Sequence, residues 1–177
     1  MSELISLEME KHCLKGLLKY PNLFPDLDVF LSEQDFTNKF HRTTYLTIKN
    51  FLLKNQKIDS VLLSNAIQNL NITHNEDIPV YDYIETLFGS NISEEATKES
   101  AKELVKLRVL RDIMANSKEE FNFVKKNRDK PLIEIIEGVD RIHNSKIKSI
   151  VSFNNEVKDI FSNLEKTIED IGNNPPD

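Results

Sequence analysis

The stretch from Ser93 to about Arg128 contains no glycine and no proline, and it most limits what this chain can fold into. Neither of the two residues that break helices interrupts it. Glu94 and Glu95 fall in its first turn, where the helix dipole favours acidic side chains. At 1.5 Å per residue such a helix is about 50 Å long, which exceeds the width of a small domain.

Apolar side chains fall on two sides of this helix between residues 104 and 114. One stripe consists of Leu107, Leu110 and Met114, and the other consists of Val105, Val109 and Ile113. A helix that is apolar on both sides is usually covered on both sides. Phe121 and Val124 continue the first stripe past the point that a compact head is expected to reach.

A second helix is predicted after the short turn Asp129-Lys130-Pro131, in which the aspartate caps the helix and the proline suits its first position. Its apolar face consists of Leu132, Ile135, Ile136, Val139 and Ile142. A long helix, a tight turn and a second helix predict an αα-hairpin. The residues expected to mediate self-association or to contact a partner are Leu110, Met114, Phe121, Val124, Ile135 and Val139. The alternative interpretation is that these side chains only pack one hairpin helix on the other.

Shorter amphipathic patterns fill the chain before this hairpin. Pro21 ends the first, Asp59 or Ser60 caps a later one, and Gly89 closes the last. The side chains expected to be buried on them include Cys13, Leu14, Leu17, Leu27, Phe40, Ile48, Leu63, Ile67, Leu70, Tyr83, Ile84 and Leu87. With only 4 glycines and 6 prolines among 177 residues, the chain is predicted to be all-α.

A last amphipathic helix is predicted from Ser152 to Ile171. Its apolar residues are Val157, Phe161, Leu164, Ile168 and Ile171, spaced 4, 3, 4 and 3. This heptad-like seam is expected to dock on a neighbouring molecule or on a missing part of the protein, and folding back onto the hairpin is the alternative. The predicted organisation is a helical head (1–92), a projecting hairpin of the same N-terminal domain (93–147), and a hinge with a separate linker helix (148–177).

The sequence contains none of the common motifs for nucleotide binding, metal binding or hydrolysis. The four glycines are Gly16, Gly89, Gly138 and Gly172, and none has the spacing of a loop that cradles phosphates. The four histidines form no helical zinc motif, so no metal is expected. Asp35 and Asp59 stand near helix starts and are interpreted as caps. The chain alone is therefore not expected to be an enzyme or to hold a cofactor.

The net charge of −6 argues against a nucleic-acid-binding domain. The only basic run is Lys125-Lys126-Asn127-Arg128, which is interpreted as a solvated helix end whose cations favour the helix dipole. No apolar run is long enough to span a membrane, and no signal peptide opens the chain, so a cytoplasmic protein is expected.

Several short motifs follow one another in a characteristic order and spacing. They are Glu10, Leu14, Gly16-Leu17-Leu18, Asp35-Phe36, His41-Arg42, Ile48, Ile58-Asp59, Leu63, Tyr83-Ile84, Leu87, Ala101, Leu104 and Val109-Leu110-Arg111. Together these motifs resemble the N-terminal domain of the DnaB-type replicative DNA helicases. The resemblance covers about residues 7–147, and the seam helix is similar to the family's linker helix. Ser100 and Leu62 stand where the family often has tyrosine and threonine, which is typical of a divergent member, such as a phage one.

The resemblance implies a collar domain that pairs through its hairpins within a hexameric ring. The parent protein would unwind DNA, and ATP and Mg²⁺ would bind only in its ATPase domain, which would follow Asp177. Primase and a helicase loader are the partners that the resemblance implies, and DNA would be contacted only through the ATPase domain. Two alternatives stay open: a stand-alone helical interaction adaptor or regulator, and a small helical DNA binder.

Overall fold

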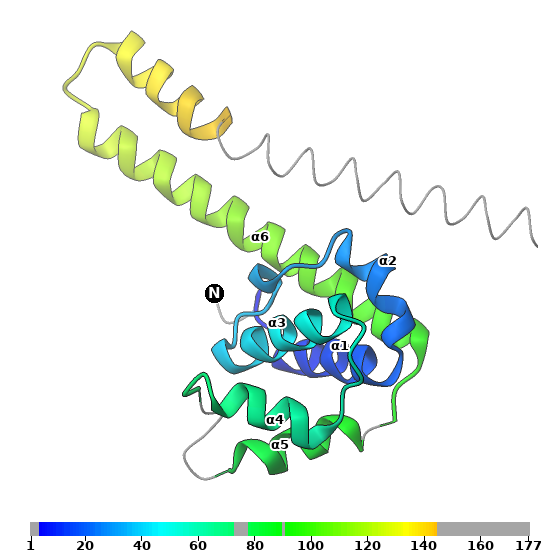
Figure 1. Ribbon diagram of the computed structural model, residues 1–177. Helices are drawn as coiled ribbons and strands as arrows, with labels where there is room; N and C mark the ends of the chain where they lie inside the picture. The colour runs from blue at the N-terminus through cyan, green and yellow to red at the C-terminus, as the bar shows by residue number, and fades with distance from the viewer. Residues whose placement is uncertain (1–3, 73–77, 90, 145–177) are drawn as a thin grey trace, which may run out of the picture. The chain divides into compact units, whose positions relative to one another are not determined.

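The structure is a computed structural model that describes residues 4–72, 78–89 and 91–144 (Figure 1). No β-strand occurs among these residues, so the all-α prediction is confirmed. The chain divides into two compact units, Met1–Arg111 and Asp112–Asp177. The predicted linker-helix residues Val157, Phe161, Leu164, Ile168 and Ile171 lie outside the described residues.

Five α-helices and two short 3₁₀ helices precede the long helix in the first unit. Their bounds are α1 (Leu7–Lys19), η2 (Pro21–Leu23), α2 (Phe24–Asp28), η3 (Glu33–Asp35), α3 (Lys39–Leu53), α4 (Ser60–Gln68) and α5 (Val80–Phe88). Side-chain caps begin three of them, because Ser6, Asn38 and Asp59 accept hydrogen bonds from backbone amides of α1, α3 and α4. Gly89 is the C-cap residue of α5, as predicted.

The core of the first unit forms where α1 contacts α3 and α5, and where α4 contacts α3 and α5. Fully buried side chains from different helices meet there, including Leu14, Leu17, Phe36, Tyr45, Ile48, Leu63, Ile67, Ile84 and Leu87. The prediction for Leu70 is wrong, since this side chain is 55% exposed. The reason is that α4 ends at Gln68, and the turn at Asn71, with a φ of 52°, takes the chain out of the helical register.

The long helix α6 (Glu94–Asn127) has the extent that the sequence predicts. Ser93 begins it, because its hydroxyl accepts a hydrogen bond from the amide of Ala96 at 3.1 Å. Six side chains of its first half are buried, namely Thr97, Ser100, Ala101, Leu104, Val105 and Leu107. Arg111, the last residue of the first compact unit, lies within α6.

The glycine at position 16 sets how closely α6 approaches α1. A Cβ atom at Gly16 would come within 2.0 Å of Oγ1 of Thr97, so only a residue without a side chain fits there. Thr97 is completely buried against this position, and its hydroxyl donates to the Ser93 carbonyl at 2.8 Å.

In the second unit, the last part of α6 is followed by a turn and by a helix that includes residues 132–144. The two helices contact each other: a Cβ at Gly138 would come within 2.1 Å of Cζ of Phe123, and His143 Nδ1 lies 3.0 Å from Oε1 of Glu120. These contacts confirm an antiparallel αα-hairpin.

Candidate functional site

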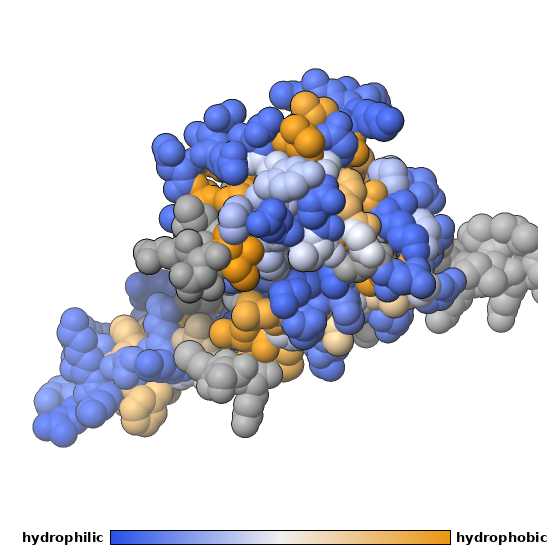
Figure 2. All heavy atoms as spheres, turned by 90° about the horizontal axis from the view of Figure 1, so that it is seen from below, coloured by the Kyte–Doolittle hydropathy of each residue, from blue (hydrophilic) through white to orange (hydrophobic). Residues whose placement is uncertain are grey.

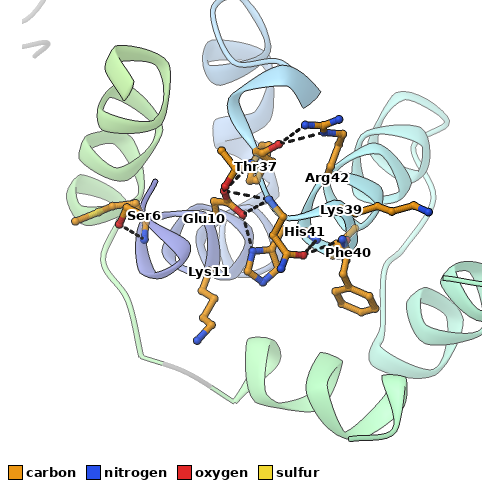
Figure 3. A network of polar contacts seen from close by, with 12 residues as sticks. Ser6, Glu10, Lys11, Thr37, Lys39, Phe40, His41 and Arg42 are labelled. Atoms are coloured by element: carbon orange, nitrogen blue, oxygen red, sulfur yellow. Dashed lines mark hydrogen bonds and ion pairs between the residues drawn. The ribbon is translucent and has the colours of Figure 1, made fainter. Parts of the chain in front are cut away.

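A row of buried polar groups joins three helices of the first unit, and Figure 3 shows its links around Glu10, Thr37 and His41. Oε1 of Glu10, on α1, accepts hydrogen bonds from the amide and the hydroxyl of Thr37, at 2.6 and 2.5 Å. Its Oε2 lies 2.7 Å from Nδ1 of His41, on α3. Nε2 of His41 lies 2.6 Å from the hydroxyl of Tyr83, on α5. One carboxylate thus organises the start of α3 and, through the imidazole, reaches α5.

Burial and hydrogen bonding act in opposite directions on the pKa of Glu10. Burial raises the pKa of Glu10, but the hydrogen bonds from His41 and from Thr37 outweigh it and leave that pKa below its ordinary value of 4.5. Burial, with the nearby charges of Glu8 and Glu10, raises the pKa of Tyr83 to about 12. Glu10 therefore stays ionised and Tyr83 stays neutral at pH 7.

A carboxylate, an imidazole and a hydroxyl in a row have the order of a catalytic relay, but this row has no room for a substrate. Glu10, His41 and Tyr83 are exposed to only 0%, 1% and 7%. Each polar group is occupied by another group of the protein. We therefore interpret this row of polar side chains as a structural network that positions α1, α3 and α5.

A second buried carboxylate ties α6 to the loop before α3. Asp35 accepts hydrogen bonds from the amide and hydroxyl of Ser32, at 2.6 and 3.0 Å, which form a capping box. Its other oxygen lies 2.7 Å from Nε of Arg108, on α6. The predicted capping role of Asp35 is confirmed, and the ion pair with Arg108 is a contact that the sequence pattern did not reveal.

The open hollows of the first unit differ in their chemistry. One, of about 370 Å³, lies between α1 and α6, and its lining of Met9, His12, Ala96, Glu99, Ser100 and Glu103 includes one histidine and two carboxylates. Another, of about 250 Å³, lies between α3 and α4, and its lining of Thr47, Asn50, Phe51, Lys54, Gln56, Ala66 and Leu70 includes no carboxylate or histidine. Within residues 4–72, 78–89 and 91–144, no three histidine, cysteine or carboxylate side chains gather closely enough to hold a metal ion. Cys13 is buried, which raises the pKa of its thiol and makes it an inert core residue.

The residues predicted to mediate self-association fall into two groups. Four of them are exposed: Leu110 by 37%, Met114 by 48%, Phe121 by 67% and Val124 by 43%. Leu110 belongs to the first compact unit, and the other three belong to the second. Ile135 and Val139 are half-buried, and they belong to the helix that approaches Phe123 at Gly138.

Further apolar side chains are exposed in the second unit, at positions that the self-association prediction did not include. They are Ile113, Leu132, Ile133 and Ile136, exposed by 45%, 71%, 60% and 47%. Leu132 and Ile136 belong to the apolar face that the sequence predicts for the second hairpin helix, and both of these side chains are exposed. Successive residues are turned by about 100° around a helix, so the apolar residues of this face spread over a wide arc. The contact of Gly138 with Phe123 covers only one edge of that arc. Apolar side chains also reach the surface in scattered groups elsewhere (Figure 2).

Comparison with known proteins connects this architecture to a family. The family model described as "DnaB-like helicase N terminal domain" matches residues 2–106, which is more than half of the chain. The chain belongs to this family. Membership places it among the N-terminal domains of helicases, so the resemblance read from the sequence is confirmed.

A solved structure supports the fold of this DnaB-like domain. The N-terminal domain of DnaB helicase from Mycobacterium tuberculosis matches with a TM-score of 0.67 and 16% sequence identity, over 79% of this chain and 97% of that one. At this identity the likeness is one of fold. A search of curated protein sequences gave no significant match. Among the residues that the structure describes, no helix combines the length and the apolar character needed to cross a membrane.

Proposed function

We propose that this DnaB-like domain is the assembly collar of a hexameric replicative DNA helicase, and that its hairpin joins it to further copies of the same chain. The observation that carries the proposal is the exposed apolar face of α6 in the second unit. Met114, Phe121 and Val124 follow at spacings of 7 and 3, which keeps them on one helix face.

Burial of this exposed apolar face at a partner would release a substantial free energy. Burying two or three such side chains at a partner contributes roughly 3 to 9 kcal/mol before the cost of association. In a two-fold symmetric pair each residue is buried twice, which doubles the gain. The exposed Leu132 and Ile136 on the second hairpin helix add apolar area in the same unit.

The enzymatic activity belongs, in this proposal, to the parent protein. ATP and Mg²⁺ bind in an ATPase domain outside this chain, and DNA is unwound there. Docking of a primase and of a helicase loader is proposed for the collar on the strength of family membership.

Sedimentation velocity tests the role of the hairpin. The wild-type chain is compared with a Phe121→Glu, Val124→Glu variant over a range of concentrations. A Val61→Glu, Leu62→Glu variant is the matched control, because it places the same charges on apolar residues of α4 that are 52% and 47% exposed. Circular dichroism checks that all three are folded.

The proposal predicts that the wild type and the control reach the same larger mass as concentration rises, while the hairpin variant stays monomeric. Equal masses for all three folded proteins at every concentration would show that the hairpin is not the interface.

A further inference from the structure

Three cations and one aromatic ring form a stripe along the second half of α6. Lys118, Phe121, Lys125 and Arg128 follow one another at spacings of 3, 4 and 3, which holds them on one face from the helix into the residue after its end. All four side chains are exposed, Phe121 by 67%. At 1.5 Å per residue this cation–aromatic stripe is about 15 Å long.

Among the residues that the structure describes, the positive charge of the stripe is not neutralised by buried ion pairs. In the described part of the chain, neither Lys118 nor Lys125 forms an ion pair. Arg128 lies 3.7 Å from Asp129, but these two side chains are 77% and 92% exposed, so their attraction is weak.

Acidic residues of the same helical segment are kept away from the stripe. At about 100° per residue, Glu120 and Glu119 lie about 100° and 160° around the helix from Phe121. Glu120 is turned toward the second hairpin helix, where its carboxylate accepts from His143. The stripe therefore presents three positive charges around an exposed ring.

We infer that the cation–aromatic stripe binds single-stranded nucleic acid. Cations that alternate with an exposed ring match a strand whose phosphates and base faces are both accessible. The phosphates pair with Lys118, Lys125 and Arg128, and one base stacks on Phe121. A duplex offers the phosphates but keeps its base faces stacked inside, so the ring selects the single strand.

This inference differs from the expectation that DNA is contacted only through an ATPase domain, and it does not depend on self-association. The two roles use overlapping surface of α6, because at about 100° per residue Met114 lies between Phe121 and the two lysines around the helix. Since a second copy and a strand compete for the same ring, strand binding shifts self-association toward smaller species.

Fluorescence anisotropy of labelled oligothymidine tests the inference with the full chain. The charge variant is Lys118→Glu, Lys125→Glu, and its matched control is Lys54→Glu, Lys57→Glu, which makes the same change in net charge at exposed lysines of the first unit. Phe121→Leu removes the ring and keeps an apolar side chain, so sedimentation of this variant separates stacking from assembly.

The wild type is expected to bind with an affinity that falls with salt, at a slope of about −2 on a double-logarithmic plot, since three cations each contribute about −0.7. The charge variant is expected to lose at least about tenfold in affinity and the control less than about twofold. Phe121→Leu is expected to lose at least about fivefold, at unchanged mass. The inference is overturned if the wild type does not bind at low salt, if the control loses as much as the charge variant, or if duplex DNA binds as tightly.

Discussion

Nδ1 of His41 lies 2.7 Å from Oε2 of Glu10, and both side chains are shielded from solvent. Because an ionised carboxylate only accepts hydrogen bonds, Nδ1 carries a proton and donates it. In the neutral imidazole, Nε2 then accepts from the hydroxyl of Tyr83, 2.6 Å away. A single ring thus connects α1, α3 and α5, which are three of the helices that form the core of this DnaB-like domain.

Glu10→Gln is expected to lower the free energy of unfolding by about 2 to 4 kcal/mol, because the amide leaves buried donors of Thr37 and His41 without their charged acceptor. Urea unfolding measures the change. Glu8→Gln is the control, since Glu8 is exposed and its ion pair with Lys11 lies on the surface, so its loss is expected to stay below about 1 kcal/mol. Equal effects of the two substitutions would show that the buried network does not hold the helices together.

Acid is expected to destabilise the domain through the same carboxylate. The pKa of Glu10 is lower in the folded protein than its ordinary value of 4.5, so below about that pH the unfolded chain binds the proton more readily. The stabilisation is therefore present above that value and is lost as pH falls through the folded pKa. Urea unfolding at a series of pH values is expected to show a shallower acid loss for Glu10→Gln than for the wild type. Identical pH profiles for both proteins would contradict this account.

Gly16→Ala is expected to destabilise the domain by about 1 to 3 kcal/mol, although alanine is the better helix former. The new Cβ would lie 2.0 Å from Oγ1 of Thr97, which is completely buried and cannot move away cheaply. Thermal or urea unfolding of Gly16→Ala, Thr97→Ala and the double variant measures the coupling.

The double variant is expected to be more stable than the sum of the two single changes predicts, because truncating Thr97 removes Oγ1 and Cγ2, which would lie 2.0 and 2.1 Å from the new Cβ, and leaves only the Cβ contact at 2.5 Å. Gly89→Ala is the control, since its added Cβ would meet its nearest atom at an ordinary 3.5 Å. Additive effects of the two single substitutions would show that α1 and α6 do not approach as closely as described.

The isolated chain is expected neither to bind nor to hydrolyse ATP. None of its four glycines has the spacing that lets backbone amides wrap phosphates. Titration of ATP with magnesium in a calorimeter is expected to give no saturable heat. A micromolar site with measurable turnover would contradict the assignment of this activity to a separate domain.

Much of the fold follows from local sequence signals. The extent of α6 could be predicted because no glycine or proline interrupts it, and the start of α4 because Asp59 supplies a side-chain cap. The apolar face of α5, Val80, Tyr83, Ile84 and Leu87, is buried as its periodicity indicates. These signals act within a few residues, which is why they can be read without a structure.

The contacts between distant residues could not be predicted in the same way. Glu10 lies 31 residues from His41, and His41 lies 42 residues from Tyr83, so no local pattern joins them. The approach of Gly16 to Thr97 and the ion pair of Asp35 with Arg108 depend equally on tertiary packing. In the hairpin, periodicity marks an apolar face, but only the contact at Gly138 decides that Ile135 is half-buried and that Leu132 stays exposed.

The central claim, that the hairpin joins copies of this domain, has a direct optical test. The chain contains no tryptophan, so Phe121→Trp introduces a single reporter at the exposed apolar face. Tyr81→Trp, at a position of α5 that is 42% exposed, is the control in the first unit. Emission is recorded while each protein is diluted from about 100 μM to about 0.1 μM, a range that brackets a moderate association.

The account predicts that the indole emission of the Phe121→Trp variant is blue-shifted at high concentration and moves to the solvent-exposed value on dilution. The change should occur over the concentrations at which the sedimenting mass falls, while the control emission stays constant. Solvent-like emission of the Phe121→Trp variant at every concentration, in a protein whose mass still rises with concentration, would show that the copies associate through another surface.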